Sequence, residues 1–372
     1  MKTVKISIAQ PYHDDLIERS VISVLRSGRL VSGPMVDSFE KSISEYLGVR
    51  NVVAVNSGTA GLHLSFLASN IKPGQEVITT PFSFAATANS IIQAGARPVF
   101  VDVNPETFNI DPQQIEKAVT EKTFAIEPVH IFGEAAEMKA IHEIAEKHNL
   151  CVVEDAAEAI GAEYHGRKIG STDGFACFST YATKNLHTGE GGFVTTNNND
   201  AADALRVLRS QGQRSKYYHI KLGYNYRMTE IAAAIGEAQV EKLDNLNQKR
   251  IRNAAQLTEA IRDLPSLTPQ AVLPNVKHIY YQYTVRFDQE KADVSREELR
   301  KRLALRGIET DVHWPTPIHL QPWYRETFGY RPGMFSNAEK LAETVLSLPI
   351  HPSVTREQIE YISENLHTIL KK

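Results

Sequence analysis

Between residues 50 and 200, the sequence alternates short β-branched runs with stretches that carry apolar residues at helical spacing. This alternation constrains the fold more than any other feature, because such strands form a mostly parallel sheet with helices on both faces. Ligands bind beyond the carboxyl ends of the strands in sheets of this kind. The predicted strands are residues 52–56, 76–80, 97–103, 124–130, 150–154, 174–179 and 192–196, with helices within 61–69, 83–93, 111–119 and 136–147.

The pattern changes beyond residue 230. Residues 230–264 are rich in Ala, Glu, Lys, Arg and Gln and predict one long helix that is broken at Pro265. A strand near residues 280–287, a helix at 295–306 and a last helix from Thr355 follow. The chain of 372 residues is long enough for two hydrophobic cores. We therefore predict an α/β fold with a large domain over residues 1–245, containing a seven-stranded sheet and an N-terminal arm, and a smaller C-terminal α+β domain over 246–372.

Charge and apolar runs limit the partners and the location. The formal net charge is −3 without a long basic block, which argues against nucleic acid as a partner. No apolar run approaches the roughly 18 residues that a membrane span needs, and no signal peptide is recognised. Cys151 and Cys177 lie in apolar, strand-like runs, which favours buried thiols in a reducing compartment over a disulfide. We expect a cytoplasmic protein.

Polar residues follow two of the predicted strands directly. In residues 56–60, Gly58 lets the backbone approach a ligand closely, and the start of a helix offers N–H groups that suit a phosphate. An ordinary capped helix is the alternative. After the strand at 150–154, Asp155 could hold a protonated ring nitrogen or a cation, or else cap the next helix. Neither segment is specific alone, and the dinucleotide-binding glycine pattern is missing.

The segment 179–192 carries the most informative chemistry. Lys184 follows an uncharged strand, is flanked by hydroxyl side chains, and precedes the glycine-rich turn at residues 189–192. A lysine can supply the amine for Schiff-base catalysis, and burial readily lowers its pKa; a solvated surface charge is the alternative. A phosphate cradle, a carboxylate and a lysine at successive strand ends are together what pyridoxal 5'-phosphate (PLP) requires.

These segments resemble the DegT/DnrJ/EryC1/StrS sugar aminotransferase family of fold-type I PLP enzymes. The resemblance covers nearly the whole chain, with its blocks in the same order. It therefore implies the fold-type I architecture and the cofactor PLP, which alternates with its aminated form PMP. The blocks are residues 27–34, 56–60, 80–89, 154–159, 179–192, 222–229 and 313–319.

The resemblance implies a role for each matching residue. Lys184 matches the lysine that forms the Schiff base and moves a proton, and Asp155 matches the acid that pairs with the ring nitrogen. Phe84 falls where the family stacks an aromatic ring on the cofactor; core packing is its alternative role. The phosphate-contacting positions match Gly58, Thr59 and Ser179, joined by Asn225 from a neighbouring subunit.

Glu158 departs from the family pattern, which commonly has Gln or His at the position that contacts the hydroxyl side of the cofactor ring. A carboxylate there would be protonated or would bond to a different partner. Lys184, by contrast, follows the aminotransferases and not the dehydratases of the family that carry His. The resemblance thus favours amino transfer over dehydration.

The resemblance also implies the partners: a nucleotide-linked keto-sugar, glutamate as the amino donor, and a second copy of the chain, with the active site at the interface of the homodimer. No metal site is predicted. Alternatives that stay open are a PLP-dependent sugar dehydratase, an aminotransferase of a carbocyclic ketone, and a catalytically silent PLP-binding regulatory protein. The nucleotide and the aminated carbon are not specified. Candidate substrate contacts are Ser32, Gly33, Glu190, Arg227, His313 and His319.

Overall fold

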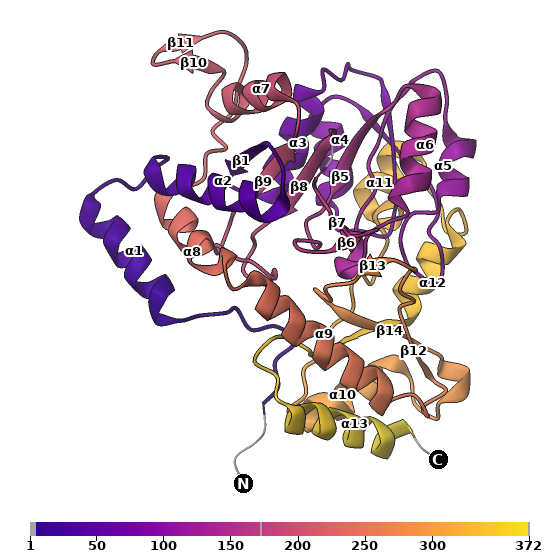
Figure 1. Ribbon diagram of the computed structural model, residues 1–372. Coiled ribbons are helices and arrows are strands. Elements are labelled where there is room, and N and C mark those ends of the chain that lie inside the picture. The colour runs from indigo at the N-terminus through magenta and orange to yellow at the C-terminus, as the bar shows by residue number, and fades with distance from the viewer. Residues whose placement is uncertain (1–4, 172, 371–372) are drawn as a thin grey trace.

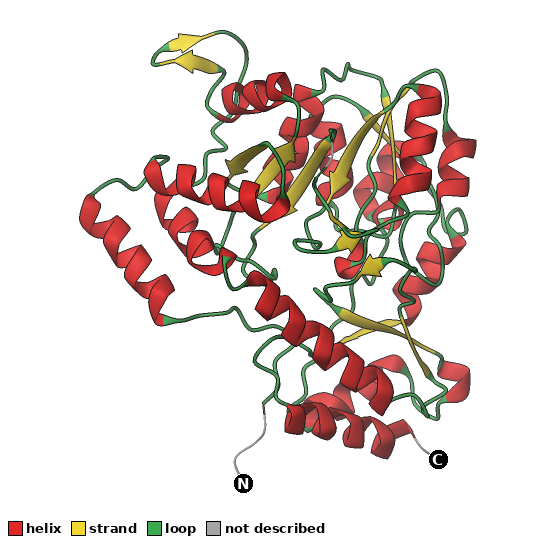
Figure 2. Ribbon diagram, in the orientation of Figure 1, coloured by secondary structure: helices red, strands yellow, loops and turns green. Residues whose placement is uncertain are grey.

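A seven-stranded sheet forms the centre of the large domain in the computed structural model, which describes residues 5–171 and 173–370 (Figure 1, Figure 2). In spatial order the strands are β1 (Asn51–Val55), β9 (Gly192–Thr196), β8 (Phe175–Ser179), β5 (Cys151–Asp155), β4 (Thr123–Ile126), β2 (Glu76–Thr79) and β3 (Arg97–Phe100). Strand β9 runs antiparallel to β1 and β8, while β8, β5, β4, β2 and β3 pair in parallel. The predicted α/β fold with a mostly parallel sheet is therefore confirmed.

Helices cover both faces of the sheet. One face is covered by α2 (Pro34–Leu47), α5 (Pro112–Ala118) and α6 (Met138–His148), and the other by α3 (Gly58–Ala68), α4 (Ala86–Gln93) and α7 (Asn199–Arg209). Successive side chains of a strand point to opposite faces. Val52 and Ala54 of β1 accordingly pack in the first core, and Val53 and Val55 in the second. The strands are apolar on both sides because both sides are buried.

The predicted helix over residues 230–264 is wrong as a single element. It is divided into α8 (Glu230–Val240) and α9 (Leu243–Ala260), and it ends before Pro265. The two halves serve different cores: Ala233 of α8 packs in the large-domain core, whereas Leu257 of α9 packs in the core of the small domain. The interruption at residues 241–242 lets α8 pack against the large domain and α9 pack against the small domain.

The small domain contains a three-stranded antiparallel sheet in the order β12-β14-β15. Its elements are β12 (Leu267–Pro269), β14 (Tyr283–Phe287), β15 (Val345–Leu348), α10 (Arg296–Leu305) and α13 (Arg356–Leu370). Its core also includes Ile6 from the start of the chain, which bridges to Ile308. The small domain thus draws on both ends of the described chain, and the boundary at residue 245 stays a prediction.

The structure also contains other helices, short strands and 3₁₀ turns outside the elements named above. Within residues 5–171 and 173–370, no helix combines the length and the apolar character needed to cross a bilayer. The remaining helices and strands are α1 (Asp15–Ser27), α11 (Pro322–Phe328), α12 (Ser336–Thr344), β6 (Glu163–Tyr164), β7 (Arg167–Lys168), β10 (Gln213–Ser215), β11 (Tyr218–His219) and β13 (Val276–Lys277), with 3₁₀ turns at Ile131–Gly133, Gln289–Lys291 and Ile318–Leu320.

Candidate active site

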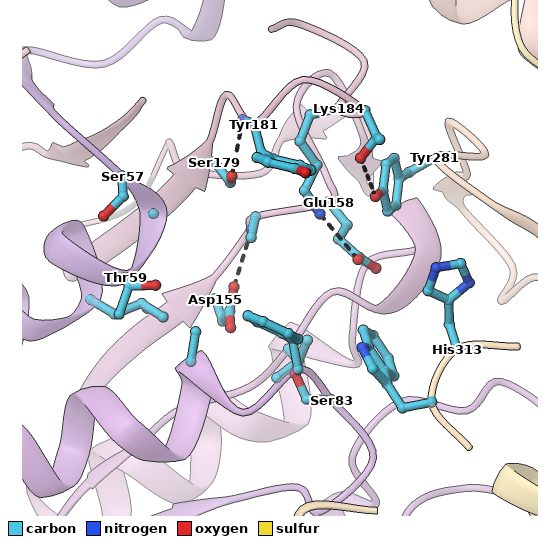
Figure 3. Close-up of a pocket in the computed structure, with 18 of the residues that line it drawn as sticks. Ser57, Thr59, Ser83, Asp155, Glu158, Ser179, Tyr181, Lys184, Tyr281 and His313 are labelled. Atoms are coloured by element: carbon cyan, nitrogen blue, oxygen red, sulfur yellow. Dashed lines mark hydrogen bonds and ion pairs between the residues drawn. The ribbon is translucent and has the colours of Figure 1, made fainter. Parts of the chain in front are cut away.

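A cavity of about 600 Å³ lies beyond the carboxyl ends of the parallel strands (Figure 3). The segments after β1, β2, β4, β5 and β8 form its walls, as predicted for a sheet of this kind. Two further segments, far along the chain, add Tyr281, His313 and Trp314. Of the residues predicted for the site, the cavity lining includes Gly58, Thr59, Phe84, Asp155, Glu158, Ser179, Lys184, Glu190 and His313.

The N-terminus of α3 forms one end of the cavity. Ser57 is its N-cap, and the Ser57 hydroxyl accepts a hydrogen bond from the N–H of Ala60 at 3.1 Å. The N–H groups of Gly58 and Thr59, in the first turn, have no intrahelical partner. Gly58 lies so close to β8 that a Cβ there would be 3.0 Å from the Cβ of Ser179. A helix N-terminus and a hydroxyl group therefore face the same small space, which suits an anion.

The carboxylate of Asp155 lies at the end of β5 and is buried beneath the cavity. One oxygen accepts a hydrogen bond from the hydroxyl of Thr87 at 2.8 Å, and the other accepts one from the N–H of Ala157 at 3.2 Å. Burial raises the pKa of Asp155, while these two hydrogen bonds oppose that rise. The preceding Glu154 faces the core, where its carboxylate lies 3.1 Å from the ring nitrogen of His130. The acidic pair thus has one structural member and one that faces the cavity.

The amine of Lys184 lies between a carboxylate and an aromatic ring. Its Nζ is 3.2 Å from Oε1 of Glu158 and 4.0 Å from the centre of the Tyr281 ring. Oε2 of Glu158 accepts a hydrogen bond from the N–H of Phe132 at 2.8 Å. Burial alone lowers the pKa of Lys184, but Glu158 and Tyr281 outweigh it and raise the pKa above its usual range. The expectation that burial brings this pKa toward neutrality is therefore wrong.

Phe84, Glu190 and His313 line the rim of the cavity. The side chain of Phe84 is 62% exposed, so its alternative role in core packing is wrong. His313 lies on the opposite side of the cavity from Ser57 and Thr59 (Figure 3), with Nε2 3.4 Å from a carboxylate oxygen of Asp311. All three stay predictions as cofactor or substrate contacts.

The predicted contacts at Ser32 and Gly33 are not supported by the structure. Neither residue lines the cavity, and the hydroxyl of Ser32 donates to the carbonyl of Met228 at 3.2 Å. Gly33 is the N-cap of α2, and the first turn of that helix is already satisfied: the carboxylate of Glu230 accepts from the N–H groups of residues 35 and 36 at 3.0 and 2.9 Å. An internal carboxylate thus accepts hydrogen bonds from the N–H groups at the start of α2 that a substrate could otherwise have used.

The predicted substrate contact at His319 is wrong. Its side chain is completely buried, with Nε2 3.1 Å from Oε1 of Glu339, and its ring packs edge-on against Phe335. Burial lowers the pKa of His319, although the Glu339 carboxylate opposes this shift. His319 therefore has a structural role in the 3₁₀ turn Ile318–Leu320.

Asn225 and Arg227 also lie outside the cavity of their own chain. They belong to the segment that returns from the β10–β11 hairpin, where Asn225 bridges to Ser210 and Arg227 bridges to Val55. Asn225 is exposed. A contact with the phosphate of a neighbouring subunit stays a prediction for Asn225, as does an anion contact for Arg227.

The lining residues that were not predicted include Ser83, Thr183, Tyr281 and Trp314. Three of them adjoin predicted residues in the sequence, so proximity to Phe84, Lys184 and His313 could have indicated them. Tyr281 has no such neighbour. It reaches the cavity only through tertiary packing, which no local pattern records.

Comparisons with known proteins match nearly the whole chain. The model of the DegT/DnrJ/EryC1/StrS aminotransferase family matches residues 11–367. A pleiotropic regulatory protein of Geobacillus stearothermophilus is 43% identical over 355 residues, which are 94% of this chain and 93% of that protein. A dTDP-3-amino-3,4,6-trideoxy-alpha-D-glucose transaminase of Streptomyces venezuelae is 38% identical, over 92% of this chain and 88% of its own.

The fold is matched by a solved structure, that of Streptomyces venezuelae DesV in complex with a ketimine intermediate. The TM-score is 0.92 at 36% sequence identity, and the match covers 96% of this chain and 94% of DesV. Sequence and structure comparisons thus agree over both domains.

Proposed function

The chain belongs to the DegT/DnrJ/EryC1/StrS aminotransferase family, and we propose that it moves an amino group from glutamate to a nucleotide-linked keto-sugar. The observation that carries this proposal is the placement of Lys184, Asp155 and the N-terminus of α3 around one cavity. A relative named as a transaminase of a dTDP-linked amino sugar supports a nucleotide-linked acceptor. The product would be an amino sugar for glycan or natural-product biosynthesis.

The residues around the cavity fit PLP, the cofactor on which this family depends. The close approach of Gly58 to Ser179 lets helix N–H groups and a hydroxyl group face one phosphate. The buried carboxylate of Asp155 can accept a hydrogen bond from a protonated ring nitrogen, and the Lys184 amine can bind the aldehyde carbon. When bound, the cofactor withdraws electrons from the carbon that carries the amino group.

The side chains of the cavity divide the remaining tasks. Nζ of Lys184 attaches the cofactor and, once released, takes the proton from the α-carbon of glutamate; it later delivers a proton to the sugar carbon that receives nitrogen. Asp155 keeps the proton on the ring nitrogen. Phe84, which lines the cavity, would stack on the face of the cofactor ring. Glu158 orients the amine through the contact of 3.2 Å.

The other candidate functions differ in what happens at Lys184. A sugar dehydratase of the type that carries His at this position is disfavoured, because the chain has a primary amine at the cavity wall. A regulatory protein has a relative of that name in its favour, but a silent cofactor-binding protein has no need for a partly buried lysine held by a carboxylate. An aminotransferase of a carbocyclic ketone uses the same residues and differs only in its acceptor.

The test is a spectroscopic one followed by product analysis. Purified protein loaded with PLP is expected to absorb in the visible range and to bleach when glutamate is added. A nucleotide keto-sugar from a panel is then expected to restore the absorbance. Its product should carry an amine in place of the ketone oxygen and keep all other oxygens. A Lys184→Ala variant that still aminates a keto-sugar would contradict the proposal. Bleaching without any acceptor product would instead favour the carbocyclic alternative, whereas a protein that binds PLP but does not bleach would favour the regulatory one.

We further propose that the chain acts as a homodimer in the cytoplasm. Large apolar side chains are exposed on α1 and on the loop around the β10–β11 hairpin, which extends away from the body of the large domain (Figure 1). Such patches are typical of protein–protein interfaces. Asn225 follows this loop and would reach the phosphate bound to the second copy. Both cysteines carry free thiols, which is consistent with a reducing compartment. The exposed apolar residues include Leu16, Ile22, Leu25, Tyr217, Tyr218 and Leu222.

Mixed dimers test the shared site. Dimers of the Lys184→Ala chain alone and of the Asn225→Asp chain alone are expected to have low activity. In the Asn225→Asp dimer this is because a carboxylate repels the phosphate. Unfolding and refolding them together restores one complete site in each hybrid dimer. Activity of the mixture well above that of either parent supports the proposal. A mixture no more active than its parents, or a monomer in sedimentation, contradicts it.

A further inference from the structure

Tyr281 reaches the cavity from the segment before β14 and faces the amine of Lys184 (Figure 3). The centre of its ring lies 4.0 Å from Nζ. Its hydroxyl lies 2.9 Å from Oγ1 of Thr183, the residue that precedes the lysine. The Glu158 carboxylate contacts the same amine at 3.2 Å. The amine is therefore held by a ring face in addition to a carboxylate.

We propose that Tyr281 is a positioning residue whose ring face holds the ammonium group of Lys184 while the lysine is not attached to the cofactor. The inference rests on the proposed function and deepens it. The negative face of an aromatic ring attracts a cation, most strongly where water is excluded. Free lysine has several rotatable bonds and many competing conformations. A fixed ring keeps Nζ close to the reacting carbon after the amine has accepted the substrate proton.

The backbone on both sides of Tyr281 is hydrogen-bonded to the loop that also positions Glu158. The N–H of Ile279 donates to the carbonyl of Gly133 at 3.0 Å, and the N–H of Gln282 donates to the carbonyl of Phe132 at 3.3 Å. A Cβ on Gly133 would lie 2.9 Å from the backbone nitrogen of Tyr281, so only glycine allows this approach. Because the N–H of Phe132 also holds Glu158, one loop sets both neighbours of the amine.

Two further observations indicate that the position of Tyr281 is specified. Phe132 and Tyr280 have φ angles of 57° and 49°, in the left-handed region that side chains other than glycine rarely adopt. Such strain concentrates at functional sites. Behind the segment, the buried guanidinium group of Arg250 on α9 donates to the carbonyl oxygens of Tyr280 and Tyr281 at 3.4 and 3.3 Å. A buried cation is thus used to fix a backbone next to the cavity.

Substitutions at position 281 separate the ring from the hydroxyl group. Tyr281→Leu removes both, and Tyr281→Phe keeps the ring. Tyr283→Phe is the matched control, because Tyr283 is buried in the core of the small domain, where its hydroxyl contacts Thr258. Each full-length variant is stripped of cofactor, and its melting temperature confirms that it is folded. The rate of PLP capture and the single-turnover rate with saturating glutamate are then measured by absorbance.

We expect Tyr281→Leu to bind PLP with full stoichiometry and to capture it faster, because the lysine is no longer held as an ammonium group, but to slow the glutamate reaction by about tenfold. Tyr281→Phe and Tyr283→Phe are expected to stay within about threefold of the unmodified protein, since a phenyl ring attracts the cation almost as well. Equal rates in Tyr281→Leu and the unmodified protein would overturn the inference. So would a Tyr281→Phe variant as slow with glutamate as Tyr281→Leu, because the hydroxyl would then carry the role.

The two readouts also keep this inference apart from the proposed function. If the unmodified protein captures PLP but reacts with no amino acid, the proposed function fails. The capture rates alone then still decide whether the ring of Tyr281 holds the lysine. If only Tyr281→Leu captures PLP faster than the unmodified protein, the inference stands independently of the substrate.

Discussion

At the scale of single residues, the cavity holds an uneven set of charges. Lys184 brings one positive charge, while Glu158 and Asp155 bring carboxylates from the same strand-end segment. The carboxylate of Glu190 also lines the cavity. Outside the lining, the carboxyl group of Glu127 is completely buried near Asp155, and its pKa is raised by burial and by the charge of Asp155. Unpaired buried charge is costly, so such a group keeps its proton. The site thus combines carboxyl groups with different tasks.

Glu127 provides a prediction of how stability depends on pH. Burial raises the pKa of Glu127 well above its usual range, and the Asp155 charge raises it further. Above the ordinary pKa, the unfolded chain loses this proton while the folded chain retains it, so stability falls as pH rises toward the folded-state pKa. In Glu127→Gln this loss is absent. We expect its melting temperature relative to the unmodified protein to be higher at pH 8 than at pH 5. The difference should be roughly 2–4 °C for each kcal/mol of unfolding free energy that the unmodified protein loses over this range.

Calorimetry of the cofactor-free protein at both pH values measures this difference. Glu146→Gln is the control, because Glu146 is exposed on α6 and has no comparable burial. The same pH dependence in Glu127→Gln and the unmodified protein would show that Glu127 is ionised in the folded state.

At the scale of elements, most strand bounds were predictable, but the strands predicted at residues 97–103 and 124–130 end earlier, at Phe100 and Ile126. Apolar runs identify β1, β5, β8 and β9 within a residue or two, because each strand is buried on both faces. The predicted helix at residues 83–93 begins only at Ala86, since the segment before it lines the cavity. The division of residues 230–264 was not predictable, because helical composition continues across the break while the packing partner changes. Local propensity does not record which core a helix joins.

The N-terminus of α2 provides a prediction at this scale. Glu230 of α8 is buried, and its carboxylate accepts two N–H groups from the first turn of α2. Removing an acceptor leaves buried donors unpaired, which costs about 1–3 kcal/mol, and more for a charged acceptor. We expect Glu230→Ala to lower the free energy of unfolding by at least this amount in urea titrations. Glu241→Ala, an exposed change at the other end of α8, is the control. Equal losses in both variants would contradict the cap.

At the scale of the whole molecule, the chain is an aminotransferase of its family, and this was predictable from the order of a few motifs. Gly58, Asp155 and Lys184 each follow a strand of one sheet, so their order in the sequence already indicated a common site. The role of Tyr281 and the burial of His319 were not predictable, since both depend on packing between segments that are distant in sequence.

Cofactor binding should stabilise the whole molecule, because a ligand that binds only the folded state lowers its free energy. We expect PLP at 100 times its dissociation constant to add about 2.7 kcal/mol and to raise the melting temperature progressively with concentration. Lys184→Ala retains the phosphate and ring contacts but not the covalent bond, so its gain should be smaller. Pyridoxine, which lacks both phosphate and aldehyde, is the control ligand. An equal gain with pyridoxine would contradict the proposed cradle and lysine.

The pairing of Ile6 with residues 307–309 has a consequence for synthesis of the chain. Ile6 donates to the carbonyl of Gly307 at 2.7 Å, accepts from the N–H of Glu309 at 2.9 Å, and is buried in the small-domain core. A ribosome adds about 5–20 residues per second, so Ile6 waits on the order of 15–60 s for its partner to be made. The large domain can fold during that interval. The small domain is completed only after residues 307–309 have been made and have paired with Ile6.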